Sequence, residues 1–87
     1  MKIRYHKRFE KQFKKLPPRS KRKALKTIEK FVENSTHKSL CNHALAGKLK
    51  GLRSISISND LRIIFEEFNG YTLVIFIDIG THNRVYK

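Results

Sequence analysis

The chain has 87 residues, 39% of them hydrophobic, which fits one domain with a single modest core. No apolar run approaches the roughly 20 residues that a membrane-spanning helix needs, and the basic start lacks the apolar stretch of a secretory signal. The only cysteine, Cys41, excludes an internal disulfide and fits a reducing compartment, where we expect an ordinary buried thiol. These features predict a single cytoplasmic domain over residues 1–87, with no membrane partner.

Positive charge is the strongest overall feature of the composition. The 20 lysines and arginines face only 7 acidic residues, so the net charge is +13, and residues 2–30 hold 13 of the 20 basic side chains. A field of this strength attracts polyanions, because each phosphate that it neutralises releases condensed counterions. We therefore expect a nucleic acid or an acidic protein as partner, ahead of an anionic membrane surface.

The N-terminal third is predicted to form a short strand followed by two helices. Residues 2–5 alternate in polarity as strands do, and two consecutive prolines at 17 and 18 separate the stretches that follow. The first proline stops one helix, and the second suits the first turn of the next.

Apolar residues recur at helical spacing in both stretches: Phe9, Phe13 and Leu16 within 6–16, and Ala24, Leu25, Ile28, Phe31 and Val32 within 19–33.

The remainder is predicted to be a polar loop or a short turn of helix, residues 34–49, and then a run of strands. Within residues 50–60, isoleucines 55 and 57 alternate with serines 54, 56 and 58. Strands Leu61–Phe68 and Tyr71–Ile79 flank Asn69-Gly70, the strongest short hairpin signal, because both turn residues take positive φ. A last edge piece is expected at Arg84–Lys87.

This order, β-α-α-β-β-β, predicts an α+β fold in which an N-terminal αα-hairpin packs on one face of a small, mainly antiparallel sheet. In such a meander the turn before Leu61 and the segment after Ile79 lie at the same end of the neighbouring strands. Asp60 and His82 should therefore approach each other.

Several side chains near that end of the strands suit the cleavage of RNA without a metal. This reaction needs a base for the 2′-hydroxyl, an acid for the leaving 5′-oxygen and cations for the phosphorane. Imidazole titrates near neutral pH, and arginine presents a planar fork of donors to phosphate. The candidates are His43, Asp60, Arg62, His82 and Tyr86, together with Lys48, Lys50 and Arg53, which lie close in sequence to His43.

Each candidate also has an ordinary structural role. His43 can cap a turn, and Asp60 is what a β-turn favours regardless of function. Arg62 can serve solubility at a strand edge, while the Tyr86 ring can close the core instead of stacking on a base. His82 is the hardest to explain structurally, since a tail beyond a core strand has no packing need for imidazole.

Two motifs give the chain a resemblance to a known family. The stretch LAGKLKGLRSISISNDLRIIFEE, followed by LVIFIDIGTHNRVY, resembles the RelE superfamily of bacterial toxin–antitoxin systems, nearest its YafQ-like branch. The resemblance covers nearly the whole chain. It implies a small metal-independent ribonuclease, without a cofactor, that cuts messenger RNA in the ribosomal A site until a cognate antitoxin neutralises it. The implied partners are an acidic antitoxin, mRNA and the ribosome with its 16S rRNA.

The resemblance assigns site residues position by position. It points to His43 ahead of the glycine, Asp60 in the turn, His82 in the G-T-H tail and Tyr86 at the aromatic tail position. Arg62 matches the arginine of D-x-R-I, and the basic strand edge is matched by Lys48, Lys50 and Arg53.

One position departs from the pattern: YafQ-like enzymes place a further histidine where this chain has Ser56. We hypothesise that His82 is the general acid and that Asp60 or His43 is the base. Arg62 and Lys50 would hold the phosphate, and Tyr86 would orient the nucleotide.

A non-enzymatic role is the competing hypothesis. ParE-like members of the same superfamily share the fold, lack ribonuclease chemistry and inhibit DNA gyrase, and a plain nucleic-acid-binding module also fits the charge. A simple binder has no need of His43 and His82 converging on Asp60, so their placement separates the two hypotheses.

Overall fold

The order of helices and strands along the chain is close to the one that the sequence predicts. The computed structural model describes residues 1–86. The strands are β1 (Lys2–Tyr5), β2 (His43–Ala44), β3 (Arg53–Ser56), β4 (Leu61–Phe68) and β5 (Leu73–Thr81). The helices are α1 (Lys7–Lys14), α2 (Pro18–Glu33) and α3 (His82–Val85), with short 3₁₀ turns η1 (Lys38–Leu40) and η2 (Gly47–Leu49).

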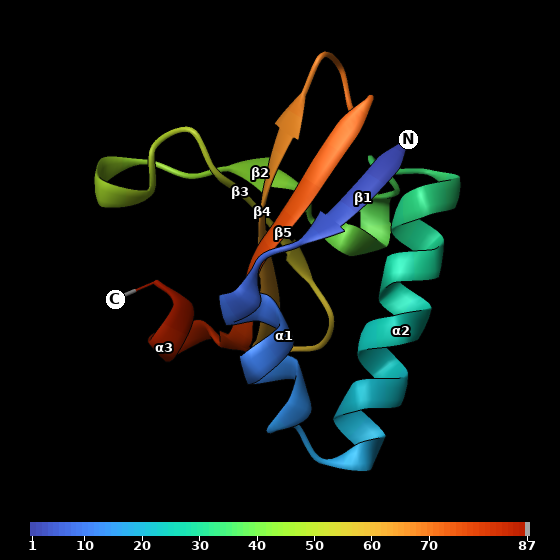
Figure 1. Ribbon diagram of the computed structural model, residues 1–87, viewed down its shortest axis with the longest axis vertical. Helices are drawn as coiled ribbons and strands as arrows, with labels where there is room; N and C mark the ends of the chain where they lie inside the picture. Colours follow the sequence, from blue (N-terminus) through green and yellow to red (C-terminus); the bar gives the residue numbers. More distant parts are fainter. Residues whose placement is uncertain (87) are drawn as a thin grey trace.

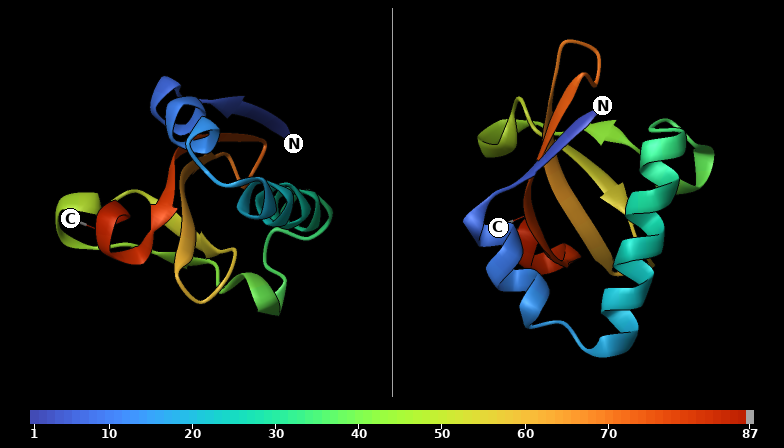
Figure 2. Two further views of the ribbon diagram at one scale, coloured as in Figure 1. Left: turned by 90° about the horizontal axis from the view of Figure 1, so that it is seen from below. Right: turned by 45° about the vertical axis from the view of Figure 1, so that its right-hand side comes forward.

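The sheet has five strands in the order β1-β5-β4-β3-β2, and only the β1–β5 pair is parallel. Helices α1 and α2 cover one face, whereas α3 and the loop that carries η2 project on the side away from α2 (Figures 1 and 2). The predicted α+β class, with an αα-hairpin on one face of a mainly antiparallel sheet, is confirmed.

The two helices begin and end where their local chemistry predicts. The ring of His6 accepts a hydrogen bond from the Arg8 amide and so caps α1, and Pro18 occupies the first turn of α2. Helical spacing assigns Leu25 and Val32 to the apolar face of α2, but they are 53% and 48% exposed. Within residues 1–86, neither these helices nor α3 has the length and hydrophobicity that crossing a bilayer requires.

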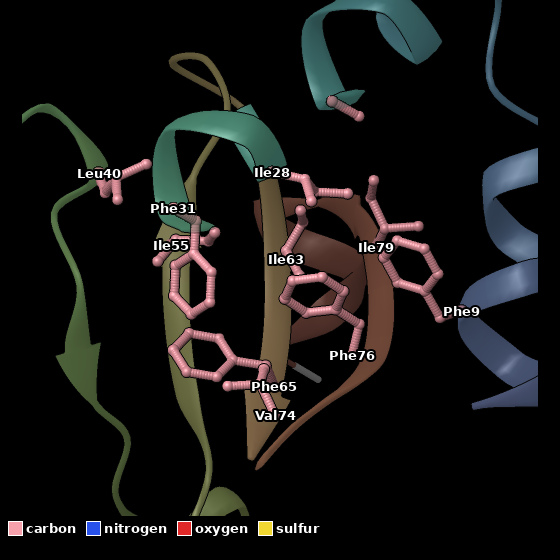
Figure 3. Packing of buried hydrophobic residues seen from close by; sticks show 11 residues of the cluster. Phe9, Ile28, Phe31, Leu40, Ile55, Ile63, Phe65, Val74, Phe76 and Ile79 are labelled. Atoms are coloured by element: carbon pink, nitrogen blue, oxygen red, sulfur yellow. The ribbon is translucent and has the colours of Figure 1, made fainter. Parts of the chain in front are cut away.

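Aromatic rings join the helices to the sheet. The Phe31 ring of α2 meets Phe65 edge-on at a centroid distance of 5.0 Å, and the Phe9 ring of α1 stacks on Phe76 at 5.6 Å (Figure 3). All four side chains are at most 3% exposed. Edge-to-face and offset rings bury a large area and add specific attraction, so these contacts fix where the helices lie on the sheet.

The β4–β5 turn is wider than a two-residue hairpin. Asn69 and Gly70 take positive φ as predicted, but Tyr71 does too, at 69°, so β5 begins at Leu73 rather than at Tyr71. The carboxylate of Glu67 accepts a hydrogen bond from the Tyr71 amide at 3.0 Å, and the Tyr71 ring packs against the core. Burial of this ring holds the residue in the left-handed region.

A β-bulge interrupts β5. Ile64 pairs with Asp78, but the next residue, Phe65, pairs with Phe76, so Ile77 has no partner on β4. Phe76 and Ile79 consequently both belong to the core cluster although they are three positions apart, an odd spacing that regular alternation would place on opposite faces. The residues between them, including Asp78, change face, because one extra residue reverses the in–out alternation.

The tail is a helix rather than an edge strand. The strand predicted over Arg84–Lys87 is wrong for residues 84–86, because α3 ends at Val85 and Tyr86 caps it; Lys87 lies outside the described residues. The hydroxyl of Thr81 accepts a hydrogen bond from the Arg84 amide at 3.4 Å, the pattern of an N-cap. This cap starts a helix at the point where the strand would otherwise continue.

The Phe31–Phe65 contact predicts a large loss of stability for Phe31→Ala. Emptying this buried site should lower the free energy of unfolding by about 3–5 kcal/mol, measured by urea titration followed by circular dichroism. The neighbouring Val32→Ala is the matched control, since its half-exposed side chain should cost less than about 1 kcal/mol. Equal losses in the two variants would contradict the packing described.

Candidate active site

The turn before β4 and the start of α3 are joined by a backbone hydrogen bond. Leu61 pairs with Thr81, and the His82 amide donates to the Asp60 carbonyl at 2.7 Å. The predicted approach of Asp60 and His82 is confirmed, although it runs through the main chain. Both residues are exposed, and within residues 1–86 no hydrogen bond engages the Asp60 carboxylate or the His82 imidazole. Both groups therefore face solvent from a fixed backbone.

Tyr86 is held at both ends of its side chain. Its ring meets the His82 ring edge-on, with centroids 4.6 Å apart. Its hydroxyl lies 2.5 Å from the hydroxyl of Ser54 on β3, a side chain with no exposed surface. Tyr86 thus connects the tail helix to the middle of β3 across the face that α1 and α2 leave uncovered.

His43 comes to the same face through strand pairing. It is the residue opposite Ser54 in the β2–β3 pair, and directly opposed residues in an antiparallel pair point to the same side. Its Nδ1 lies 2.7 Å from the carbonyl oxygen of Cys41. A carbonyl can only accept, so Nδ1 carries the proton and donates, which leaves a lone pair on the exposed Nε2.

These contacts make a continuous set, which we call the polar row, and most of it comes from residues predicted from the sequence. One end is the Asp60 turn, followed by the His82 imidazole and the Tyr86 ring, and the other end is His43. Buried Ser54 links the two halves through the Tyr86 hydroxyl. The members of the polar row are Asp60, His82, Tyr86, Ser54 and His43.

The basic candidates separate into three groups. Lys48 and Lys50 are exposed in the η2 loop, which projects on the same side as α3 (Figures 1 and 2). Arg62 instead donates to the carbonyls of the turn: Nη1 to Ser58 at 2.5 Å and Leu61 at 3.1 Å, and Nη2 to Asn59 at 3.1 Å. Its guanidinium therefore braces the Asp60 turn.

Arg53 lies on the other face of the sheet. It pairs with core residue Phe65, and its Nε donates to the Asn42 side chain at 2.9 Å. Since the next residue, Ser54, faces the polar row, the alternation of β3 directs Arg53 away from it. The structure therefore does not bring Arg53 together with the other predicted site residues.

Two features of this region were not singled out from the sequence. Ser54 was indistinguishable from Ser56 and Ser58 in the alternating strand. Asp78 is a buried carboxylate bonded to Arg84 and Arg8, and an acid inside the apolar run LVIFIDI was the signal for it.

Cys41, expected to be buried, is exposed. No group of three or more potential metal-ligating side chains occurs among residues 1–86.

Comparisons with known proteins give matches over nearly the whole chain. The family model described as "Bacterial toxin of type II toxin-antitoxin system, YafQ" matches residues 1–87. The crystal structure of YafQ from E. coli strain BL21(DE3) is 25% identical and has a TM-score of 0.77, covering 98% of this chain and 97% of that one.

Two further solved structures share the fold. YafQ in the E. coli DinJ–YafQ toxin–antitoxin complex is 26% identical, with a TM-score of 0.74 over 98% of this chain and 96% of that one. A YoeB/ParE toxin from Agrobacterium tumefaciens is 15% identical, with a TM-score of 0.77 over 94% and 99%. The comparison with curated protein sequences found no match.

The Tyr86–Ser54 bond predicts a specific stability effect. Tyr86→Phe leaves the buried Ser54 hydroxyl without a partner and should lower the free energy of unfolding by about 1–3 kcal/mol in a urea titration. The double variant Tyr86→Phe/Ser54→Ala should be no less stable than Tyr86→Phe, because both polar groups are then gone. Tyr5→Phe, at a half-exposed ring, is the control. Additive losses in the double variant would contradict this bond.

Proposed function

Because the chain belongs to the YafQ family of toxins of bacterial type II toxin–antitoxin systems, we propose that it is a metal-independent endoribonuclease that cleaves messenger RNA on the ribosome. The observation that carries this proposal is the polar row. Two exposed imidazoles lie on one face, and an exposed carboxylate belongs to the turn that is hydrogen-bonded to His82, all on backbones fixed by hydrogen bonds. Fixed, solvent-facing groups that accept and donate protons are what transesterification of RNA requires.

The proposed reaction begins with removal of the 2′-hydroxyl proton. His43 is the better base on geometry, because its Nδ1–H is committed to the Cys41 carbonyl and Nε2 holds a free lone pair. Asp60 is the alternative base, with a carboxylate that no described residue hydrogen-bonds. The 2′-oxygen attacks phosphorus, and the bond from phosphorus to the 5′-oxygen breaks as His82 protonates that oxygen. The products are a 2′,3′-cyclic phosphate and a 5′-hydroxyl.

Binding of the charged substrate falls to the residues around the polar row. Lys48 and Lys50 present exposed ammonium groups on the side of α3, where they neutralise phosphate. Tyr86 orients the nucleotide with the exposed part of its ring, whose other end is bonded to Ser54. Arg62 holds the Asp60 turn in place, so its contribution is mainly to position Asp60 and His82.

Serine at position 56 removes one titratable group that YafQ-like enzymes carry. Ser56 is paired with Arg62, next to the Asp60 turn, and a hydroxyl transfers protons poorly at neutral pH. The proton transfers therefore fall to His43, Asp60 and His82. The ParE-like alternative has no such requirement, and the likeness to the YoeB/ParE structure is a likeness of fold alone.

An acidic antitoxin in the cytoplasm is the proposed regulatory partner. The YafQ structure solved with DinJ is a toxin–antitoxin complex, and this chain carries a net charge of +13. Opposite fields accelerate encounter between two proteins and are screened by salt. An antitoxin segment that covers the basic residues beside the polar row would also exclude RNA from it.

His82→Ala tests the proposed reaction directly. General acids contribute roughly 10²–10⁴-fold, so cleavage of mRNA on programmed ribosomes should slow at least about a hundredfold under single-turnover conditions. The ends of the wild-type products should be cyclic phosphate and 5′-hydroxyl. His43→Ala and Asp60→Ala, compared side by side, identify the base as the variant with the larger loss.

His37→Ala is the matched control, because His37 is an exposed histidine that only caps η1. Its rate should stay within about threefold of wild type. All variants are first shown to unfold at the wild-type urea concentration. A His82→Ala rate within threefold of wild type would refute the assignment of the acid, and absence of cleavage by the wild type would favour a non-enzymatic toxin.

The partner assignment predicts conditional toxicity. Bacterial cells that express this chain alone should stop growing, and co-expression of an acidic protein encoded beside it should restore growth. For the purified pair, the association rate constant should fall by about tenfold between low and high ionic strength, measured by stopped-flow fluorescence. Unimpaired growth, or an association rate that salt leaves unchanged, would contradict the proposal.

A further inference from the structure

A buried carboxylate on β5 holds the tail helix that carries His82 and Tyr86. The Asp78 side chain is only 8% exposed, and it accepts hydrogen bonds from two arginines. Nη2 of Arg84 lies 2.7 Å from Oδ1, and Nε of Arg8 lies 3.1 Å from Oδ2. The Ile79 amide also donates to Oδ1 at 2.8 Å. A carboxylate this buried is stable only with such partners.

The two arginines do not contribute equally. The Arg84 side chain is 34% exposed and its bond is short, whereas the Arg8 side chain is 56% exposed and its bond is longer. Exposed ion pairs contribute little, because water and salt screen them. The Arg84–Asp78 pair is therefore the main one, and it joins α3 to the sheet, while Arg8 extends from α1.

Three successive residues of β5 contact the Arg84 guanidinium or leave space for it. Asp78 supplies the carboxylate, and the Ile79 carbonyl accepts a second bond from Nη2 at 2.6 Å. At Gly80 the guanidinium occupies the space that a Cβ would take, so any other residue there would displace it. Gly80 has an ordinary strand conformation, and its missing side chain serves this close approach.

The position of Arg84 within α3 decides what this attachment does. A helix of four residues has no stability of its own, so tertiary contacts set its orientation. His82 and Tyr86 are four residues apart and share one side of the helix, and their rings are in contact. Arg84, midway between them, points about 200° away at 100° per residue. Attachment of Arg84 to β5 thus turns the opposite side of α3, which carries both rings, away from β5, so that the Tyr86 hydroxyl reaches Ser54 of β3.

We propose that Asp78, Gly80 and Arg84 form a clip that positions the His82 imidazole and the Tyr86 ring for the reaction on RNA. These are positioning residues, because they act through α3 and do not touch the substrate. The inference rests on the proposed ribonuclease activity. It adds three residues to that site, none of which the reaction chemistry itself requires.

The test compares two substitutions that change net charge in opposite directions. Asp78→Asn removes a negative charge and Arg84→Gln removes a positive one, so RNA binding should strengthen in the first and weaken in the second. The single-turnover rate on saturating programmed ribosomes should nevertheless fall in both, by roughly 10–100-fold, because misplaced catalytic groups lose alignment. The double variant should be no slower than the slower single variant.

Arg8→Gln is the matched control. It removes the same charge as Arg84→Gln from the same carboxylate, but it detaches α1 rather than α3, and its rate should stay within about threefold of wild type. Gly80→Ala is a second test that keeps every charge and should slow cleavage like Arg84→Gln. Rates within threefold of wild type for Asp78→Asn and Gly80→Ala would overturn the clip.

Hydrogen exchange separates failure of the clip from failure of the proposed function. The His82 amide is bonded to the Asp60 carbonyl, so loosening of α3 should speed its exchange at least about tenfold while amides of β4 are unchanged. This readout needs no RNA. If the wild type cleaves no RNA but His82 exchange rises in Asp78→Asn and Gly80→Ala, the proposed function fails and the clip stands. Unchanged exchange in both variants overturns the clip.

Discussion

The bulge at Ile77 is the constraint on which the exposed face of the sheet depends. Before it, Phe76 faces the helices; after it, Ile79 does, and Asp78 and Gly80 change sides. With unbroken alternation, Asp78 would share the side of Phe76 and place a carboxylate among aromatic rings, at a cost of several kcal/mol. The extra residue sends that carboxylate to the face where α3 lies. One irregular position thus allows a single strand to complete the apolar core and to hold the tail helix.

The sequence predicts a helix or strand correctly where the spacing of its apolar residues repeats over enough positions to be recognised. Helical spacing predicted α1 and α2, and the Asn-Gly pair located the β4–β5 hairpin. The predicted strand order places Asp60 and His82 near each other, and their main chains are hydrogen-bonded. The bulge and the burial of Ser54 could not be found this way, because an added residue and a buried serine leave no mark in an alternating pattern. The four-residue α3 is too short for a helical period in the sequence to reveal it.

Rigid and reactive groups are separated across the polar row. The groups proposed for chemistry, the two imidazoles and the Asp60 carboxylate, are exposed, whereas the groups that hold them are buried or are backbone atoms: Ser54, Asp78 and the carbonyls of Cys41 and Asp60. This arrangement keeps the imidazole nitrogens accessible to a substrate while fixing where they lie. Arg53 is close in sequence to His43 and adjacent to Ser54, but its position on β3 directs its side chain to the opposite face of the sheet.

The parallel pairing of β1 with β5 has a consequence for synthesis. Lys2 pairs with Leu73, so β1, the first strand to be synthesised, can pair only after β5, the last strand, has been made. Helix α1 also packs on β5. Contacts so distant in sequence slow folding and cannot form on a growing chain. A partly translated molecule therefore lacks both β5, which lies between β1 and β4, and the tail that carries His82. The ribonuclease activity that we propose therefore requires α3 to be synthesised and packed, which gives the proposed antitoxin time to bind before that activity appears.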